Sequence, residues 1–208
     1  MSERNLRLLR VFKKTNGLIR DADYPESQIF QWAVIIALLV TESILNSYFF
    51  AQGSDLGLLG GFLQAFLISI ANIGSALLMG AYILPWKNHI QTDENDNPLE
   101  KWSMQKSIAV IAIPFYCILI FTFNLAVAHY RAQLEIQPIK AVINAMTTMA
   151  ASPFGIGNFE AWVLCLMGLL FSSFALIKGY TSDDSYPGYG KMTRAYLIEE
   201  GNKAGQPQ

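Results

Sequence analysis

The 208-residue chain has few of the residue types on which metal sites and disulfide-stabilised folds depend, with only two cysteines and two histidines. Cys117 and Cys165 both lie in apolar segments, and neither belongs to a CxxC pair or to a His/Cys spacing typical of zinc ligands. We therefore expect the two thiols to be buried as small apolar side chains. Charged residues make up 15% of the chain, well below the roughly 25% of ordinary soluble domains. This shortage indicates that lipid rather than water surrounds most of the protein.

Catalytic motifs are also missing. The sequence has no nucleophile elbow, HExxH motif, Walker A motif or Rossmann glycine pattern. His129 lies at the end of one apolar stretch and Glu42 in the middle of another, so Ser43 and Tyr130 have no base at a matching depth. The formal net charge of −1 gives no reason to expect a nucleic-acid partner. We expect a non-enzymatic protein with no catalytic residues, no metal and no cofactor.

What the sequence does have is long apolar stretches, each of a length that can cross a bilayer as a helix, which needs about 20 residues. They predict an all-α integral membrane protein with four transmembrane helices between a basic amphipathic segment, 1–29, and a tail, 181–208. The membrane domain is expected at 30–180. Its spans are expected at 30–50, 56–84, 107–130 and 159–178. The second is unusually long, which predicts that it is tilted or projects beyond the hydrocarbon.

Lysine and arginine are distributed unevenly around these stretches. Thirteen lie before the first stretch, between the second and third, or after the fourth, whereas the other two connections hold only Arg131 and Lys140. The positive-inside rule therefore predicts that both termini are cytoplasmic. The basic stretch before the first span and the length of that span indicate an uncleaved anchor rather than a signal peptide. In size and layout the chain resembles many small prokaryotic membrane subunits, so we expect it in the inner (plasma) membrane.

The spacing of apolar and basic residues in 3–16 predicts a basic amphipathic helix. Apolar side chains recur on one side of it, and Arg7, Arg10 and Lys14 lie opposite. Such a helix can bind the anionic inner leaflet of the bilayer. The alternative is a solvated segment that serves only to orient the protein in the membrane.

Glu42 is the most informative single residue, because it lies near the middle of the first apolar stretch. A charged carboxylate at that depth costs several kcal/mol unless it is protonated, paired or hydrated. Asn46 lies one helical turn away on the same face, and Asn72 reaches about the same depth in an antiparallel hairpin. We therefore expect a Glu42–Asn72 hydrogen bond. Gln64 belongs to the same small and polar stripe of the second span.

Three roles remain open for this polar group, which consists of Glu42, Asn46, Gln64 and Asn72. It can lock helices together, line an ion or proton pathway, or bind a ligand. Interhelical polar contacts in membranes contribute only about 0.6–2 kcal/mol, so a lock would define register more than it would stabilise the bundle. A pathway requires several copies of the chain, because one acid per chain is too few for a pore.

The start of the second span is rich in glycine. Gly57 and Gly61 have GxxxG spacing and Gly60 adds a further small residue, so a neighbouring helix can approach closely. We expect the protein to form a homo-oligomer through this surface.

The connection 132–158 carries apolar residues at three- and four-residue steps from Ile136 to Ala150. This pattern predicts an amphipathic helix on the outer surface of the membrane. The alternative is a re-entrant element, which membranes tolerate only where protein or water shields it.

The leading functional hypothesis is an oligomeric channel or ion pathway with a membrane-embedded glutamate. The alternative is a membrane scaffold or sensor that recruits a cytoplasmic protein, as in bacterial stress or defence complexes. That alternative depends on the predicted cytoplasmic surfaces, namely the helix 3–16, the acidic loop 92–100 and the tail around 186–190.

Overall fold

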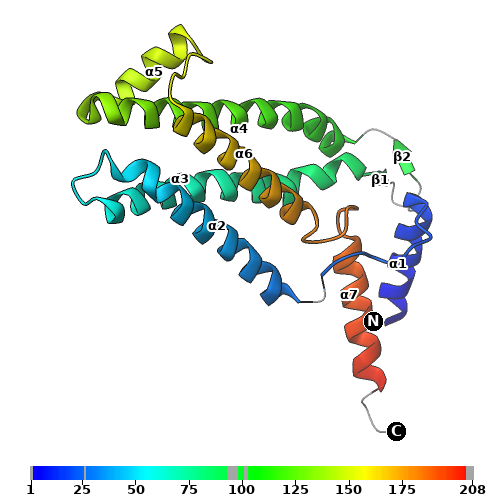
Figure 1. Cartoon of the computed structure of the whole chain (residues 1–208). Helices are drawn as coiled ribbons and strands as arrows, with labels where there is room; N and C mark the ends of the chain where they lie inside the picture. The colour runs from blue at the N-terminus through cyan, green and yellow to red at the C-terminus, as the bar shows by residue number, and fades with distance from the viewer. Residues whose placement is uncertain (1, 26, 93–97, 101–102, 205–208) are drawn as a thin grey trace.

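The structure is a computed structural model that describes residues 2–25, 27–92, 98–100 and 103–204 (Figure 1). It contains four helices that are long and apolar enough to cross a membrane, so the prediction of a helical integral membrane protein with four candidate spans is confirmed. Two short helical segments, a π-helical and a 3₁₀ one, continue the second of these helices to Asn88. The elements of the bundle are α2 (Gln28–Ala51), α3 (Leu58–Leu78), η1 (Met79–Ile83), η2 (Leu84–Asn88), α4 (Met104–Ile136) and α6 (Phe159–Tyr180).

The remaining elements lie at the two ends of the bundle (Figure 1). Helices α1 (Ser2–Asn16) and α7 (Tyr189–Ala204) lie at the end that carries both termini, and η3 (Pro138–Lys140) and α5 (Ala141–Ala151) lie at the other. Two short antiparallel strands, β1 (Gln91–Thr92) and β2 (Pro98–Glu100), connect η2 to α4. The predicted acidic loop 92–100 lies partly outside the described residues.

Side-chain caps explain where three of the long helices begin. The Ser27 hydroxyl accepts a hydrogen bond from the Phe30 amide, and the Ser103 hydroxyl accepts one from the Lys106 amide. The side-chain Oδ1 atom of Asn158 accepts from the amides of Glu160 and Ala161 in the first turn of α6. Each cap satisfies N–H groups that the helix leaves without a partner, so the apolar stretches begin as helices at these positions.

The third span is longer than predicted. Helix α4 continues to Ile136, six residues beyond the expected end, and α5 begins only at Ala141. The expected surface helix starting at Ile136 is therefore wrong at its beginning. Polar residues after Tyr130 indicated an end of the span, but Arg131 and Glu135 form an ion pair one turn apart within the helix, and such pairs stabilise helices.

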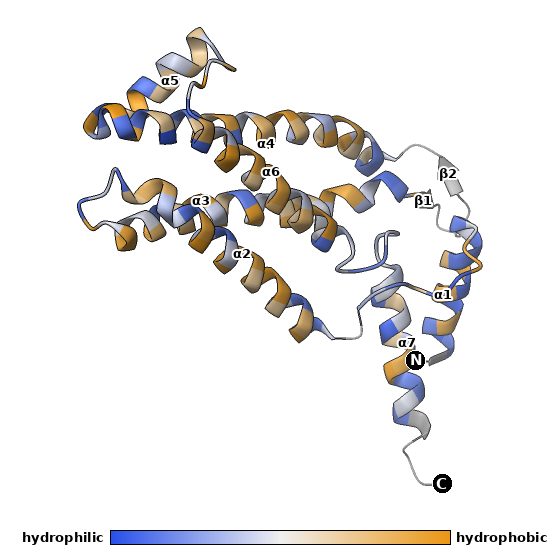
Figure 2. Cartoon of the chain, viewed as in Figure 1, coloured by the Kyte–Doolittle hydropathy of each residue, from blue (hydrophilic) through white to orange (hydrophobic). Residues whose placement is uncertain are grey.

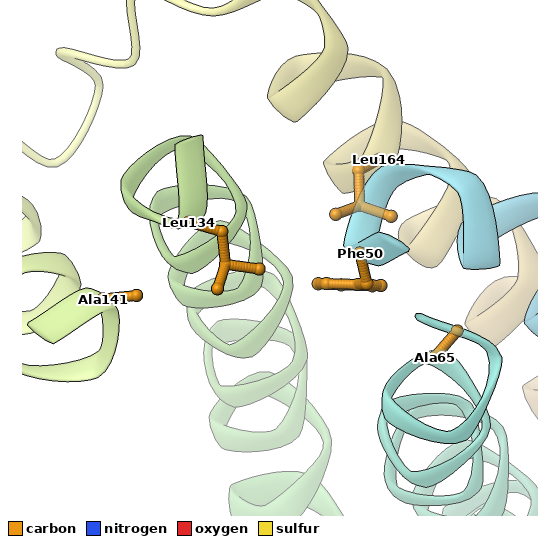
Figure 3. Packing of buried hydrophobic residues seen from close by; sticks show 5 residues of the cluster. All are labelled: Phe50, Ala65, Leu134, Ala141 and Leu164. Atoms are coloured by element: carbon orange, nitrogen blue, oxygen red, sulfur yellow. The ribbon is translucent and has the colours of Figure 1, made fainter. Parts of the chain in front are cut away.

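The interior of the bundle is built from small side chains as well as large ones. Ala65, Ala76, Ala161 and Ala175 are fully buried, which allows the helices to approach closely. One apolar cluster joins α2, α3, α4, α5 and α6, and its members are Phe50, Ala65, Leu134, Ala141 and Leu164 (Figure 3).

Many large apolar residues of the four long helices are exposed, and much of the ribbon of these helices has the colour of hydrophobic residues in Figure 2. This pattern is typical of helices that face lipid. The two cysteines differ in this respect, because Cys165 is buried whereas Cys117 is exposed on the surface of α4. The expectation of two buried thiols is therefore wrong for Cys117, because a position within an apolar stretch does not distinguish a lipid-facing side from an interior one.

Candidate functional site

A buried polar network joins all four long helices through Asn72 of α3. The Asn72 side-chain amide donates to Glu42 Oε1 of α2 at 3.0 Å and to the Gly168 carbonyl oxygen of α6 at 2.8 Å. In turn, the Asn124 amide of α4 donates to Asn72 Oδ1 at 3.0 Å. The hydrogen bond expected between Glu42 and Asn72 is present. We call these three side chains with the Gly168 carbonyl the central network.

The central network is shielded from its surroundings. Glu42 is 1% exposed, Asn72 0% and Asn124 3%. Gly168 makes room for it, because a Cβ atom at this position would collide with Asn124 Oδ1. Hydrogen bonds are electrostatically stronger in such a low-dielectric interior than in water, and a polar group without a partner is correspondingly costly.

Three buried oxygen atoms close to this network in sequence have no hydrogen-bond partner among the described residues. They are Glu42 Oε2, Asn46 Oδ1 one turn further along α2, and Ser69 Oγ one turn before Asn72 on α3. Buried polar atoms of this kind are rare in native proteins and call for an explanation. Carboxyl, amide and hydroxyl oxygens can all accept from water or contact a cation. The Ser69 hydroxyl and the Glu42 carboxyl group lie close enough to interact, so these oxygens form a group of weakly bonded acceptors beside the central network.

Further polar contacts extend along α3 on either side of the network. Gln64 accepts a hydrogen bond from the Tyr130 hydroxyl at 3.4 Å, and Ser75 Oγ lies 3.2 Å from the Tyr116 hydroxyl. From Gln64 to Ser75 the helix rises by about 16 Å. Asn72 contacts Glu42, whereas Gln64 contacts Tyr130 instead. Gln64 lies closer than Asn72 to the α2–α3 turn at one end of the bundle.

Arg131 forms a second polar centre, which the sequence analysis missed. It is 0% exposed, and its Nη2 atom lies 2.7 Å from Glu160 Oε2, 2.9 Å from Glu135 Oε1 and 3.2 Å from Gln52 Oε1. Its Nε and Nη1 atoms have no partner among the described residues. The four-residue spacing of Arg131 and Glu135 was a visible signal, but the contacts with Gln52 and Glu160 depend on the fold. We call these four residues the Arg131 cluster.

His129 connects α5 and the loop after it to α4. Its Nδ1 atom lies 3.2 Å from Thr148 Oγ1 and its Nε2 atom 2.9 Å from the Pro153 carbonyl oxygen. Beside it is a cavity of about 280 Å³, lined in part by Glu135 and Asn158. The connection 132–158 is therefore packed on α4, and the choice between a surface helix and a re-entrant element stays a prediction.

The glycines expected to join copies of the chain lie within it. A Cβ atom on Gly61 would collide with the backbone of α2 at Ser47 and Ala51, and one on Gly60 would collide with the Ser54 side chain. Gly57 has a positive φ of 56°, a conformation that favours glycine, at the turn before α3. Gly61 therefore allows α2 and α3 to approach closely within one chain, and Gly57 and Gly60 belong to the turn and the first turn of the helix that follow α2. A homo-oligomer stays a prediction, but without support from this surface.

Helix α1 presents its basic residues to solvent and its other side to α7. Arg7, Arg10 and Lys14 are exposed, and Phe12 stacks on Tyr189 with the ring centroids 5.5 Å apart. The apolar side of α1 is therefore partly covered by protein. Binding of the three basic residues to a membrane surface stays a prediction.

A third polar centre fastens the N-terminal segment to the tail. Arg20 donates to both carboxylate oxygens of Asp184, at 2.6 and 2.9 Å, and the amides of Asp23 and Tyr186 donate to the same carboxylate. The Tyr189 hydroxyl donates to the Arg20 carbonyl oxygen at 2.6 Å. Burial alone would raise the pKa of Asp184, but Arg20 and the two amides together hold it below its ordinary value. We call this group the terminal clamp.

Known proteins give no guide to the role of these three centres. Comparison of the chain with protein families, with curated proteins and with solved structures found no match. We therefore infer function from the chemistry of the central network, the Arg131 cluster and the terminal clamp.

Proposed function

We propose that the protein is a non-enzymatic membrane protein that conducts protons or cations through its polar interior, with Glu42 as the central group. One observation carries the proposal. The Glu42 carboxyl group is 1% exposed in the bundle, and only one of its two oxygens is bonded to a neighbour, Asn72. An acid in that position is costly to the fold, which argues for a role that a purely apolar contact would not fill.

The chemistry around Glu42 suits positive rather than negative species. The atoms left without partners are oxygens of Glu42, Asn46 and Ser69, and oxygen-rich linings favour cations. Asn72 holds the carboxyl group in place while leaving Oε2 available. The polar contacts at Gln64 and Ser75 extend this lining along α3.

The proposal includes assembly of several copies. One acid per chain is too few for a pore. Because Glu42 is buried inside its own bundle, a ring lined by several Glu42 side chains also requires the helices of each copy to reorient on assembly. Since Gly60 and Gly61 are used within the chain, the contact between copies involves other parts of the lipid-facing surface. The mass of the particle in a mild detergent measures this assembly.

The experiment uses purified protein in liposomes, with Glu42→Gln as the main variant. Glutamine retains an oxygen that can accept from Asn72 but cannot exchange a proton or carry a charge. We expect the wild type to pass protons or cations, and the variant to lose most of the flux while keeping its thermal stability and particle mass. A wild type that conducts nothing under voltage or pH steps, or a variant that conducts as well as the wild type, would leave Glu42 as a structural lock.

A second candidate function is a membrane scaffold that recruits a cytoplasmic protein. The observation that favours it is the pair of helices α1 and α7, which extends from the bundle at the end that carries both termini (Figure 1). Leu197 and Ile198 of α7 are 50% and 64% exposed, and exposed apolar residues outside the spans favour protein contacts.

The scaffold hypothesis is tested by crosslinking in cells with the full chain. A double variant, Leu197→Glu with Ile198→Glu, should lose the crosslinked partner, and Lys191→Glu on the same helix is the matched control. If no crosslink depends on Leu197 and Ile198 while Glu42→Gln abolishes activity in cells, the scaffold hypothesis is wrong.

A further inference from the structure

A cavity of about 460 Å³ opens at the end of the bundle that carries both chain termini. One wall is formed by the first turns of α2, and a second by the end of α3 with η1 and η2. The tail residues between Ser182 and Arg194 form the third wall. The cavity therefore lies where the membrane-spanning helices meet the polar terminal region, and its volume is in the range of small-molecule sites, about 300–1,000 Å³.

The walls from α2, α3 and η1 are apolar and aromatic. Trp32, Leu78 and Tyr82 line the cavity and are 58%, 57% and 64% exposed. Tryptophan and tyrosine are enriched where membrane helices meet the headgroup region, because their rings are apolar with one polar edge. This side of the cavity is therefore open to lipid and suited to the first part of an acyl chain.

The wall from the tail carries one positive side chain, Arg194, and two negative ones, Asp183 and Asp184. The two guanidinium nitrogens of Arg194 lie 3.1 and 3.3 Å from the two carboxylate oxygens of Asp183, and both side chains are about one-third exposed. The neighbouring Asp184 is already neutralised by Arg20 in the terminal clamp. The polar edge of the cavity thus offers a balanced pair of charges that are bonded to each other. Both side chains are partly exposed, so a ligand can still reach the further lone pairs of Asp183 and the further N–H groups of Arg194.

We propose that this cavity binds a membrane phospholipid whose zwitterionic headgroup carries a primary ammonium group. The phosphate lies against Arg194, the ammonium donates to Asp183, and the acyl chain follows Trp32, Leu78 and Tyr82. A headgroup without an ammonium places its negative charge beside Asp183, and the described residues that line the cavity include no cation besides Arg194 to balance it. A choline headgroup has no N–H group to donate to the carboxylate.

Such a lipid contacts the bundle and the tail at the same time. A ligand that binds only when the tail is docked stabilises the docked tail by mass action, and docking in turn strengthens binding of the ligand. The site therefore couples the lipid composition of the membrane to the position of α7, whatever passes through the central network.

The first test measures lipid retention by native mass spectrometry of the full chain with phosphatidylethanolamine, phosphatidylcholine or phosphatidylglycerol added. Leu78→Trp fills the cavity from the lipid side, and Leu63→Trp adds the same bulk to an exposed position on the same helix, outside the residues that line the cavity. We expect the wild type and the Leu63 variant to retain phosphatidylethanolamine preferentially, and the Leu78 variant to lose that preference. Equal retention of all three lipids by the wild type, or unchanged retention by the Leu78 variant, overturns the proposal.

The second test addresses the headgroup. Asp183→Asn should reduce the preference for phosphatidylethanolamine over phosphatidylcholine, and added phosphatidylethanolamine should slow amide exchange in α7 of the wild type. Soluble phosphoethanolamine should fail to displace the lipid, because it lacks the acyl chain that the aromatic wall binds. Displacement by the soluble compound at equal concentration, or no change in α7 exchange, contradicts the assignment of a membrane lipid that docks the tail.

Discussion

Arg131 shows how a charged side chain is accommodated within the bundle at the residue scale. The guanidinium is 0% exposed, whereas the side chains of its two acidic partners, Glu135 and Glu160, are 36% and 42% exposed. If the arginine is removed, water can hydrate the two partly exposed acids. If the acids are neutralised instead, the buried guanidinium is left as a charge that water cannot reach. A buried charge that loses its partner costs about 3–5 kcal/mol, whereas replacing the charge by an apolar side chain of similar size is much less costly.

We therefore predict an asymmetry between two changes to the same cluster. Glu135→Gln combined with Glu160→Gln should lower the free energy of unfolding by about 3–5 kcal/mol. Arg131→Met, which removes the charge and fills the same space, should cost less than that pair. Denaturant unfolding in mild detergent measures both, and a greater loss for Arg131→Met would show that the cation itself stabilises the bundle.

Some contacts of the candidate site could be predicted from the sequence, and others could not. The depth of Glu42 and Asn72 in their apolar stretches was sufficient to pair them, because depth follows from position along a span. Asn124 lies at a similar depth on α4 but was not assigned to the pair, since its contact with Asn72 depends on how α4 is rotated about its axis. Rotation and helix order come from packing, and the sequence pattern alone did not determine them.

At the scale of elements, the approach of α2 and α3 depends on Gly61. A Cβ atom there would meet the backbone at Ala51 at 2.6 Å, whereas one on Gly74 of the same helix would meet nothing within 4 Å. Backbone atoms cannot move aside as a flexible side chain can, so the helices must separate.

The same substitution should consequently have opposite effects at the two glycines. Gly61→Ala should destabilise the protein by about 1–3 kcal/mol through overpacking. Gly74→Ala should stabilise it by about 0.5–1 kcal/mol, because alanine has the higher helix propensity. Thermal unfolding of single copies in detergent measures both. If Gly61→Ala changed only the particle mass and left stability unchanged, the glycine would belong to a contact between copies, as the sequence suggested.

The terminal clamp gives the tail a dependence on pH. The pKa of Asp184 is lower in the folded protein than its ordinary value of 3.8, because Arg20 and two amides stabilise the carboxylate. A group with a depressed pKa contributes stability above its unfolded pKa, and that contribution is lost as the pH falls through the folded pKa. We expect α7 to stay docked at neutral pH and to be released only below about pH 4.

Limited proteolysis of the tail at a series of pH values checks this expectation. Asp184→Asn removes the charge that Arg20 binds, so cleavage near α7 should be fast at neutral pH and should no longer increase on acidification. Asp55→Asn is the matched control, because it removes the same charge from an exposed position between α2 and α3, far from the tail. Slow cleavage of the Asp184 variant at neutral pH would show that other contacts, such as Phe12 on Tyr189, hold the tail.

At the scale of the whole molecule, the order of the elements explains why both termini lie together. Four candidate spans return the chain to the end where it began, so the segments before α2, between α3 and α4, and after α6 share one end of the bundle (Figure 1). The apolar stretches of the sequence predicted this number of spans, and the uneven distribution of lysine and arginine predicted that both termini lie on the same side of the membrane. The sequence did not predict that α1 packs on α7 or that Arg20 reaches Asp184, 164 residues later in the chain, because such contacts depend on a turn geometry that periodicity does not describe.

The orientation of the bundle in the membrane is the last prediction, and it follows from charge. In the sequence, thirteen lysines and arginines fall before the first span, between the second and third, or from the end of the fourth onward, whereas Arg131 lies near the end of α4 and Lys140 in η3. The terminal end should therefore face the cytoplasm. Asn202→Cys and Ile139→Cys place single thiols at exposed positions near the two ends, in a background with Cys117 and Cys165 replaced. A membrane-impermeant maleimide should label Cys at 139 in intact cells and Cys at 202 only after permeabilisation. Reversed labelling contradicts the orientation, and labelling of both from outside contradicts a crossing by α6, the candidate span between the two positions. The expected result would place the terminal clamp and the lipid cavity at the inner leaflet, where α7 can respond to lipids on the cytoplasmic side.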